Sequence, residues 1–179
     1  MELNLNESAE GCTSDTGLQY TAVGDADLST QRILNMPGHL IRRLHQASVS
    51  IFARATKNWG ITPVQYATLV AAMSKPGVDQ CNLAQTVAFD KATIGDVIKR
   101  LEARGLINRS KGSRDRRAKQ VFITEPGRAL LSEVDAVILE AQRDILAPLS
   151  EDERRVFLSL LGKLVLNEDE EQMRALRDK

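Results

Sequence analysis

The chain has 179 residues, of which 42% are hydrophobic, so it can form one domain, or two small ones, around a buried core. Its 24 basic and 24 acidic residues give a formal net charge of zero, which taken alone argues against a nucleic-acid partner. No apolar run approaches the ~18 residues of a membrane span, and MELNLNESAE lacks the basic and apolar segments of a secretory signal, so we expect a cytoplasmic protein with no membrane partner.

The sequence gives no support to cofactor or catalytic chemistry. Two cysteines, Cys12 and Cys81, are too few for a disulfide scaffold, and two histidines without a CxxC motif are too few for a typical zinc site. The sequence shows no nucleophile beside a base, no glycine-rich phosphate loop and no pair of carboxylates on one helical face. We therefore expect no metal, no cofactor and no enzymatic activity.

Residues 1–30 predict a flexible acidic tail. They contain six acidic residues and no lysine or arginine, with Ser, Thr, Asn and Gly between them. Residues 31–60 contain the first predicted helix, because apolar residues from Leu40 to Ile51 recur at helical spacing.

Two helices are predicted next. Thr62 is a predicted N-cap, and Gln65, three residues later, completes a capping box for a helix through about Met73. The sequence KPGVDQ ends this helix, and a short helix around residues 82–87 follows.

The following helix has Asp90 as its predicted N-cap and Gly105 as its C-terminal stop. Its apolar face holds Ile94, Val97, Ile98 and Leu101. At about 100° per residue, the opposite face carries small and polar residues, namely Ala92, Asp96, Lys99 and Ala103, with Thr93 and Gly95 on its flanks. Gly95 and Asp96 lower helix propensity, which a close fit in a DNA major groove would justify. Alternatively, Gly95 is a packing compromise and Asp96 an ordinary surface charge.

A basic segment extends from Lys99 to Lys119. It contains nine basic and two acidic residues, a local excess of seven positive charges. Two short extended segments, one starting after Gly105 and one at QVFIT, flank the polar tip SKGSRDRRAK. We predict a β-hairpin wing, which with the three preceding helices gives a winged helix-turn-helix; the alternative is a surface hairpin with solvated arginines.

From about Pro37 to Val165, the order of elements and the run DKATIGDVIKRLEARGLINRSKGSRDRRAKQVFITEPG resemble the MarR family of bacterial transcriptional regulators. The most specific parts are RLEARGLI, the DRR of the wing and TEPG. The resemblance implies a mainly α fold with a small β-hairpin wing, in which residues 61–125 form the winged helix-turn-helix. Residues 31–60 and 126–179 would form a helical dimerisation region, and the partners would be double-stranded operator DNA and a second copy of the chain.

The same resemblance assigns DNA contacts by position. The residues expected to face DNA are Lys91, Ala92, Thr93, Gly95, Asp96 and Lys99 on the recognition helix and Arg114, Arg116 and Arg117 on the wing. Relatives often have a basic or hydroxyl residue where Asp96 stands. Its carboxylate either accepts from cytosine N4 or holds a neighbouring arginine.

Residues 126–179 predict two more helices. TEPG opens the first, which ends at Pro148, and Ser150 and Glu153 form a capping box for the second. The helix that starts at TEPG carries two apolar stripes, more than a small winged domain can cover. Both C-terminal helices are therefore expected to pack against a partner chain. The alternative is a bundle within one chain.

The helix predicted within residues 31–60 also suggests a ligand site. Arg43 and His39 lie at the edge of its apolar stripe, whereas Arg42 points the opposite way. A guanidinium there suits the carboxylate of a small aromatic acid. PGHLIRRLHQ resembles members that sense aromatic catabolites, and nicotinate-pathway repressors that respond to hydroxynicotinate. His39, Arg43 and His45 are therefore the predicted ligand residues and 6-hydroxynicotinate the suggested effector; an interhelical ion pair for Arg43 is the alternative.

The predicted function is a repressor that a small aromatic or pyridine carboxylic acid releases from its operator. A thiol-based redox-sensing repressor is one alternative, although Cys12 lies in an acidic segment that disfavours a thiolate, and Cys81 has few charges near it in sequence. A helical interaction module that does not bind DNA is the other.

Overall fold

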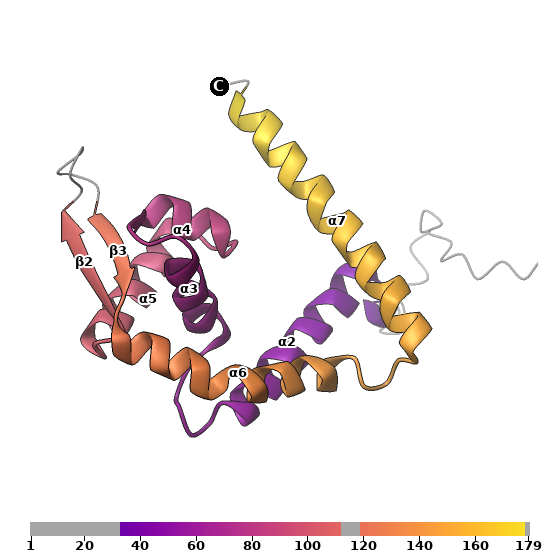
Figure 1. Cartoon of the computed structure of the whole chain (residues 1–179). Coiled ribbons are helices and arrows are strands. Elements are labelled where there is room, and N and C mark those ends of the chain that lie inside the picture. Colours follow the sequence, from indigo (N-terminus) through magenta and orange to yellow (C-terminus); the bar gives the residue numbers. More distant parts are fainter. Residues whose placement is uncertain (1–32, 112–118, 178–179) are drawn as a thin grey trace, which may run out of the picture. The chain divides into compact units, whose positions relative to one another are not determined.

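The computed structural model describes residues 33–111 and 119–177, with side chains up to Ser110 and from Lys119 to Leu166. These ranges are mainly helical and contain a small antiparallel sheet (Figure 1), so the predicted fold class is confirmed. The elements are α2 (Pro37–Ala55), α3 (Pro63–Ser74), β1 (Val78–Asp79), α4 (Gln80–Thr86), α5 (Lys91–Ala103), β2 (Ile107–Lys111), β3 (Lys119–Ile123), α6 (Glu125–Ile145) and α7 (Glu151–Arg177). None of the helices in these ranges could cross a membrane.

Helix starts follow the capping signals in the sequence. Thr62 Oγ1 accepts from Gln65 N at 3.3 Å, and Gln65 Oε1 accepts from Thr62 N at 3.1 Å, so the predicted capping box of α3 is confirmed. At the start of α7, Glu153 Oε2 accepts from Ser150 N at 2.8 Å, and Ser150 Oγ accepts from Glu153 N at 3.4 Å. The second predicted box is therefore also confirmed.

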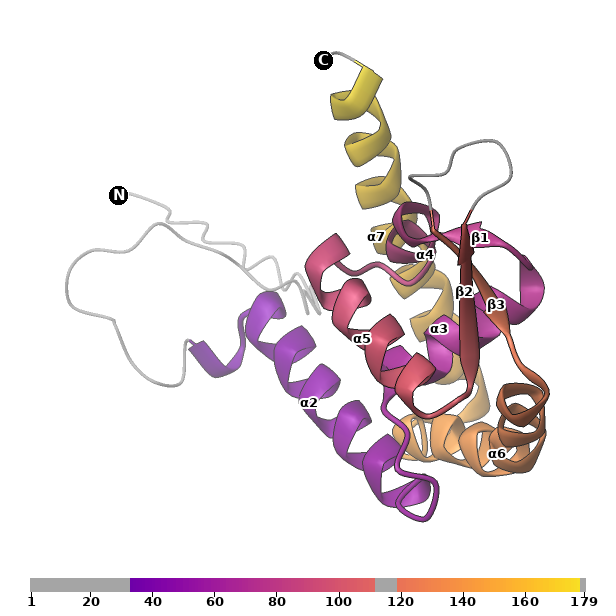
Figure 2. The ribbon, with the colours of Figure 1, turned by 90° about the vertical axis from the view of Figure 1, so that its left-hand side faces the viewer.

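The sheet contains the predicted hairpin and one further strand (Figure 2). β2 and β3 pair antiparallel along their full lengths, with Ile107 opposite Ile123. β1 pairs with the other edge of β3, with Val78 opposite Val121, so the strand order is β1-β3-β2. β1 was not predicted because a strand of two residues shows no alternation in the sequence. Only its pairing with β3 defines it.

The core of the winged unit forms around α5. Its apolar stripe is buried as predicted, with exposed fractions of 0% for Ile94 and Leu101, 1% for Ile98 and 7% for Val97. Residues of α3, α4, α6 and the sheet belong to the same buried cluster. Because this stripe is buried, the rotation of α5 about its axis is fixed and the opposite face is held towards solvent.

A boundary between Leu40 and Ile41 divides the chain into two units. The second unit, Ile41–Lys179, contains the sheet, α3 to α7 and most of α2. It therefore includes every element of the winged helix-turn-helix. The finer domain boundaries predicted after residues 30, 60 and 125 remain predictions, and the predicted acidic tail lies outside the described residues.

Most of the exposed apolar side chains of the C-terminal helices lie on α7, while Leu139 of α6 is also 55% exposed. Leu131, Val134 and Ile138 of α6 are buried in the core, against which α3 also packs. Val137 and Ile145 of the same helix are only half-buried, so the prediction that its stripes exceed what the winged unit can cover remains a prediction. Large apolar side chains remain exposed on α2 and α7; these are Leu40, Ile41, Leu44, Val49, Val156, Leu158, Leu160, Leu161, Leu164, Val165 and Leu166.

Gly127 gives a test of how tightly α6 packs against the sheet. A Cβ at this buried position would collide with the carbonyl oxygen of Leu106 and lie 2.8 Å from Ile123 Cγ1. Because both neighbours are part of the packed core, we expect Gly127→Ala to lower the free energy of unfolding by about 2 kcal/mol or more. The matched control is Gly38→Ala in the first turn of α2, where no atom lies within 4 Å of the added Cβ. Denaturant unfolding that gave equal stability for both variants would contradict this packing.

Candidate nucleic-acid interface

Asp90 fixes the N-terminal end of α5. Its Oδ1 accepts from Thr93 N at 2.8 Å and its Oδ2 accepts from Thr93 Oγ1 at 2.5 Å, which confirms the predicted N-cap. The hydrogen bond from the Thr93 side chain, followed by that from its backbone N–H, lowers the pKa of the Asp90 carboxyl. Thr93, a predicted DNA contact, is half-buried, and its hydroxyl proton is used in this cap. Only the oxygen lone pairs remain for a donor on DNA.

The outward face of α5 is exposed, as predicted. Lys91, Ala92, Asp96 and Lys99 are all exposed. Asp96 pairs with Lys99 at an Oδ1–Nζ distance of 3.0 Å, so its partner is a lysine rather than the neighbouring arginine considered from the sequence. The two side chains are 67% and 68% exposed, and a pair this exposed is worth about 1 kcal/mol or less. Either residue can therefore exchange its partner for a base edge or a phosphate at low cost.

Gly95 packs against α4. A Cβ at this position would lie 3.0 Å from Gln80 Nε2, which is tighter than an ordinary contact. The same Nε2 donates to the backbone oxygen of Lys91 at 2.9 Å. The missing side chain at Gly95 thus leaves room for a brace from α4 to the first turn of α5. This geometry supports the packing explanation of Gly95, and its contact with DNA remains a prediction.

An ion pair ties β2 to α5. Arg109 Nε donates to Glu102 Oε2 at 2.8 Å, and Arg109 Nη2 contacts the same oxygen. This hydrogen bond lowers the pKa of Glu102 and raises that of Arg109, so both groups are charged at neutral pH. The pair links the base of the wing to the last turn of α5. The wing residues predicted to contact DNA, Arg114, Arg116 and Arg117, lie outside the described residues.

A hollow of about 590 Å³ lies beside the first turn of α5 and was not predicted from the sequence. Lys91 of α5 and Lys119 of β3 bring positive charge to it, which suits a phosphate group, while Arg109 of β2 is already paired with Glu102. Cys81 of α4 is exposed in this hollow. The complete lining is Asp79, Gln80, Cys81, Asn82, Lys91, Arg109 and Lys119. Arg109 and Lys119 were counted in the basic segment, but only strand pairing brings them near Lys91.

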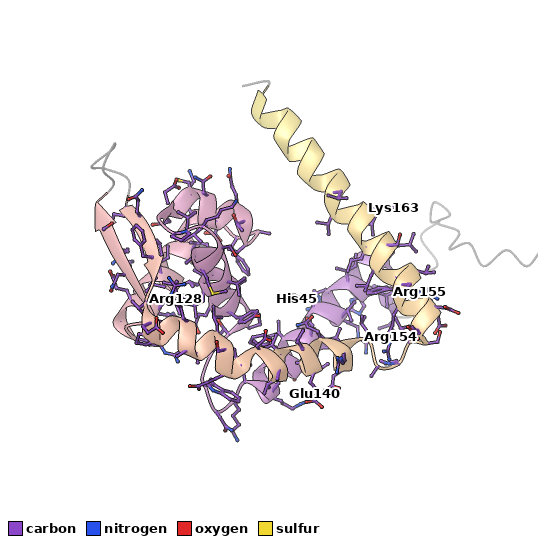
Figure 3. All side chains as sticks on the ribbon, in the orientation of Figure 1. His45, Arg128, Glu140, Arg154, Arg155 and Lys163 are labelled. Atoms are coloured by element: carbon purple, nitrogen blue, oxygen red, sulfur yellow. The ribbon has the colours of Figure 1, made fainter. Side chains whose placement is uncertain are left out.

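The predicted ligand residues all lie on α2, where Figure 3 marks His45. His39 is half-buried, and Arg43 and His45 are exposed. Within the described part of the chain Arg43 forms no ion pair, so the alternative of an interhelical ion pair finds no partner there. The ligand role of these three residues remains a prediction.

A second hollow, of about 510 Å³, lies between α3 and α6 and was also not predicted. Arg128, marked in Figure 3, and Tyr66 supply its aromatic and cationic groups. Burial, and then the negative charge of Asp135, raises the pKa of the Tyr66 hydroxyl, so this group stays a neutral hydrogen-bond donor. The lining is Tyr66, Val70, Met73, Arg128, Leu131, Ser132 and Asp135. The hollow therefore combines apolar side chains and an aromatic ring with one guanidinium and one carboxylate, and Arg128 is the group that could pair with a small acid.

The capped helix pair of α4 and α5, followed by a paired two-stranded wing, defines a winged helix-turn-helix protein. The sequence profile of the MarR family matches residues 61–119, which span α3 to the start of β3. The HTH-type transcriptional repressor NicR of Pseudomonas putida is 33% identical over 128 residues, covering 72% of this chain and 81% of the relative.

Two solved structures are similar over most of their lengths. BpsR of Bordetella bronchiseptica, whose DNA binding is regulated by 6-hydroxynicotinic acid, is 31% identical with a TM-score of 0.70, covering 74% of this chain and 94% of that one. PcaV of Streptomyces coelicolor, in complex with its natural ligand, is 30% identical with a TM-score of 0.67. The similarity covers 81% of this chain and 97% of PcaV. The chain belongs to the MarR family of transcriptional regulators, and its winged helix is a DNA-binding unit.

The contact between Gln80 and Gly95 predicts a non-additive pair of substitutions. Gly95→Ala should displace the Gln80 amide and weaken operator binding, because the brace on the first turn of α5 is lost. In a Gln80→Ala background the added Cβ meets no amide, so the same substitution should cost less, and alanine should favour the helix by up to ~1 kcal/mol. A double-mutant cycle measures operator affinity and unfolding free energy for the parent, both single variants and the double variant. The coupling free energy between the two substitutions should be about 0.5 kcal/mol or more. An equal cost of Gly95→Ala in both backgrounds would instead indicate that DNA itself needs the open position.

Proposed function

We propose that the protein is a sequence-specific repressor that binds its operator as a homodimer and is released by a small aromatic or pyridine carboxylic acid. DNA binding is supported mainly by the orientation of α5, whose apolar stripe is buried while Lys91, Ala92 and Asp96 are exposed; Lys91 also lines the hollow that Lys119 borders. A helix with small and polar residues outward can enter a major groove, and neighbouring cations can hold the phosphates.

The proposed DNA contacts on α5 agree with this orientation, and those on the wing rest on the resemblance to the MarR family. The major-groove set is Lys91, Ala92, Thr93, Gly95, Asp96 and Lys99, and the wing set is Arg114, Arg116 and Arg117. Lys119 adds a phosphate contact at the base of the wing, where it lines the hollow. Phosphate contacts fix the register of the protein on DNA, and the short side chains of α5 then read base edges.

The exposed apolar side chains of α7 support a homodimer. These side chains, which run from Val156 to Leu166 and include Leu160 at 53% and Leu164 at 62%, cover an arc of about 280°. A surface helix of one domain needs an apolar arc of only about 100°. The excess is the signature of a helix that is buried when a second chain packs against it, and twofold pairing would place two recognition helices on successive major grooves, about 10 bp apart.

Leu164→Glu should dissociate the proposed dimer. A carboxylate buried in an apolar interface is strongly unfavourable, so sedimentation should shift to the monomer and operator affinity should fall by at least about tenfold. The matched control is Lys163→Glu, at the neighbouring exposed position marked in Figure 3. That variant should remain dimeric. A Leu164→Glu protein that stays dimeric and binds DNA like the parent would exclude α7 as the interface.

The effector class is supported by two groups of residues. Arg43 on α2 is an exposed guanidinium without an ion-pair partner in the described part of the chain. Arg128 and Tyr66 bring a second guanidinium and a neutral hydroxyl to the hollow between α3 and α6. A guanidinium can pair bidentately with the carboxylate of a bound acid. The response of BpsR to 6-hydroxynicotinic acid makes this pyridine acid the first compound to test.

The proposed release needs a difference in affinity between two states. The acid can lower DNA affinity only if it binds more tightly to a spacing of the recognition helices that does not fit the operator. A coupling of roughly 1 to 3 kcal/mol would be ordinary, and operator DNA must then weaken the acid by the same factor.

A gel shift on DNA from the region upstream of its own coding sequence, at several salt concentrations, tests the proposed function. 6-Hydroxynicotinic acid and a panel of aromatic acids should release the DNA. Arg43→Ala should bind the operator like the parent but resist release, because the partner of the carboxylate is lost; Arg42→Ala is the matched control. If Arg128→Ala alone resists release, the acid binds between α3 and α6. If no acid in the panel releases the DNA, the proposed effector class is wrong.

A further inference from the structure

Arg104 joins the C-terminal end of α5 to the turn that follows α2. It is the C-cap residue of α5, and Gly105 follows with a φ of +70°, which ends the helix. Its Nη1 donates to the backbone oxygen of Gly60 and its Nη2 donates to that of Trp59, both at 2.9 Å. Two parallel hydrogen bonds from one planar guanidinium fix direction as well as distance.

The turn held by Arg104 is itself well defined. The N–H groups of Trp59 and Gly60 both donate to the backbone oxygen of Thr56, at 3.0 and 3.2 Å. Gly60 has a φ of +57°, a conformation that favours glycine. Thr56 is buried, with its hydroxyl within 3.1 Å of the carbonyl oxygens of Phe52 and Ile61. This turn therefore presents its two outward carbonyl groups in a fixed orientation.

The turn is also joined to α6. Trp59 Nε1 donates to Glu133 Oε2 at 3.1 Å, and the Trp59 ring packs against the core. Among the side-chain hydrogen bonds of the described residues, those of Arg104 are the ones that join α5 to this turn. A continuous polar connection thus runs from Glu133 on α6 through Trp59 to Arg104 on the recognition helix.

We propose that Arg104 is a positioning residue for DNA binding, whose guanidinium clamps the Trp59–Gly60 turn and so transmits movements of α2 and α6 to the recognition helix. The clamp acts on the end of α5 opposite the Gln80 brace, so both ends of the helix are held. Arg104 contacts no base in this role. The part of this proposal in which Arg104 passes an effector signal to α5 rests on the proposed function, release of the operator by an aromatic acid.

A lysine at position 104 distinguishes a clamp from a phosphate contact, because it keeps the charge but not the planar shape of the side chain. A phosphate contact needs positive charge, which lysine retains, whereas two bonds to neighbouring carbonyl groups need the planar fork. Arg104→Lys should therefore behave like Arg104→Gln. Both variants should bind the operator about tenfold more weakly than the parent, with non-specific DNA affinity changed by less than about twofold. The salt dependence of operator binding by Arg104→Lys should equal that of the parent.

Trp59 is the one tryptophan of the chain and provides a readout that does not depend on DNA. In free protein, acrylamide should quench Trp59 fluorescence more strongly in Arg104→Lys than in the parent, because the turn is released. The ratio of operator affinities without and with 6-hydroxynicotinic acid should also fall in this variant. The matched control is Arg143→Lys, the same exchange at an exposed arginine of α6, which should match the parent in every measurement. Circular dichroism melting verifies that all variants are folded.

The outcomes separate this proposal from the proposed function. If no acid in the panel releases the parent from its operator but Arg104→Lys still weakens operator binding and exposes Trp59, the positioning role is supported and the proposed release fails. If Arg104→Lys matches the parent in quenching and in operator affinity, the clamp is overturned. If Arg104→Gln weakens operator and non-specific DNA equally and flattens the salt dependence while Arg104→Lys does neither, Arg104 is a phosphate contact and the clamp is again overturned.

Discussion

The burial of Ile94, Ile98 and Leu101 is the interaction on which the DNA-binding surface depends. These side chains are almost completely removed from water, and each such side chain contributes roughly 1.5 to 3 kcal/mol on burial. Any rotation of α5 about its axis would expose them, so the opposite face is held outward by the core and not by its own residues. That face is consequently free to carry Asp96, which adds little to helix stability.

Polar contacts add to the core in fixing the position of α5. Asp90 caps the start of α5, Gln80 braces its first turn, and Arg109 ties the wing to Glu102 in its last turn. Each contact joins α5 to a different neighbour or to its own end, so the helix, α4 and the wing can move as one body. Arg104 lies at the opposite end and faces the turn after α2. The recognition helix is thus held by its neighbours and joined to the turn after α2.

The exposed apolar side chains of α7 give the second constraint on function. α6 buries Leu131, Val134 and Ile138 in the core, whereas Leu160, Leu164 and Leu166 of α7 remain more than half exposed. Exposed surface of this kind is rare on monomers and marks an interaction site. A regulator that reads a two-part operator needs two recognition helices at a fixed spacing, and in the proposed homodimer α7 would help to set it.

The sequence by itself determined the helices, their caps and the hairpin, because helical periodicity, N-cap residues and strand alternation are local signals. Thr62, Asp90 and Ser150 were identified in this way and are confirmed. Only the tertiary structure decided that β1 pairs with β3, that Gln80 fills the space left at Gly95, and that Lys119 and Arg109 line the same hollow as Lys91. These features join residues of different elements, and such contacts are set by packing and strand register, which leave no periodic trace in the chain.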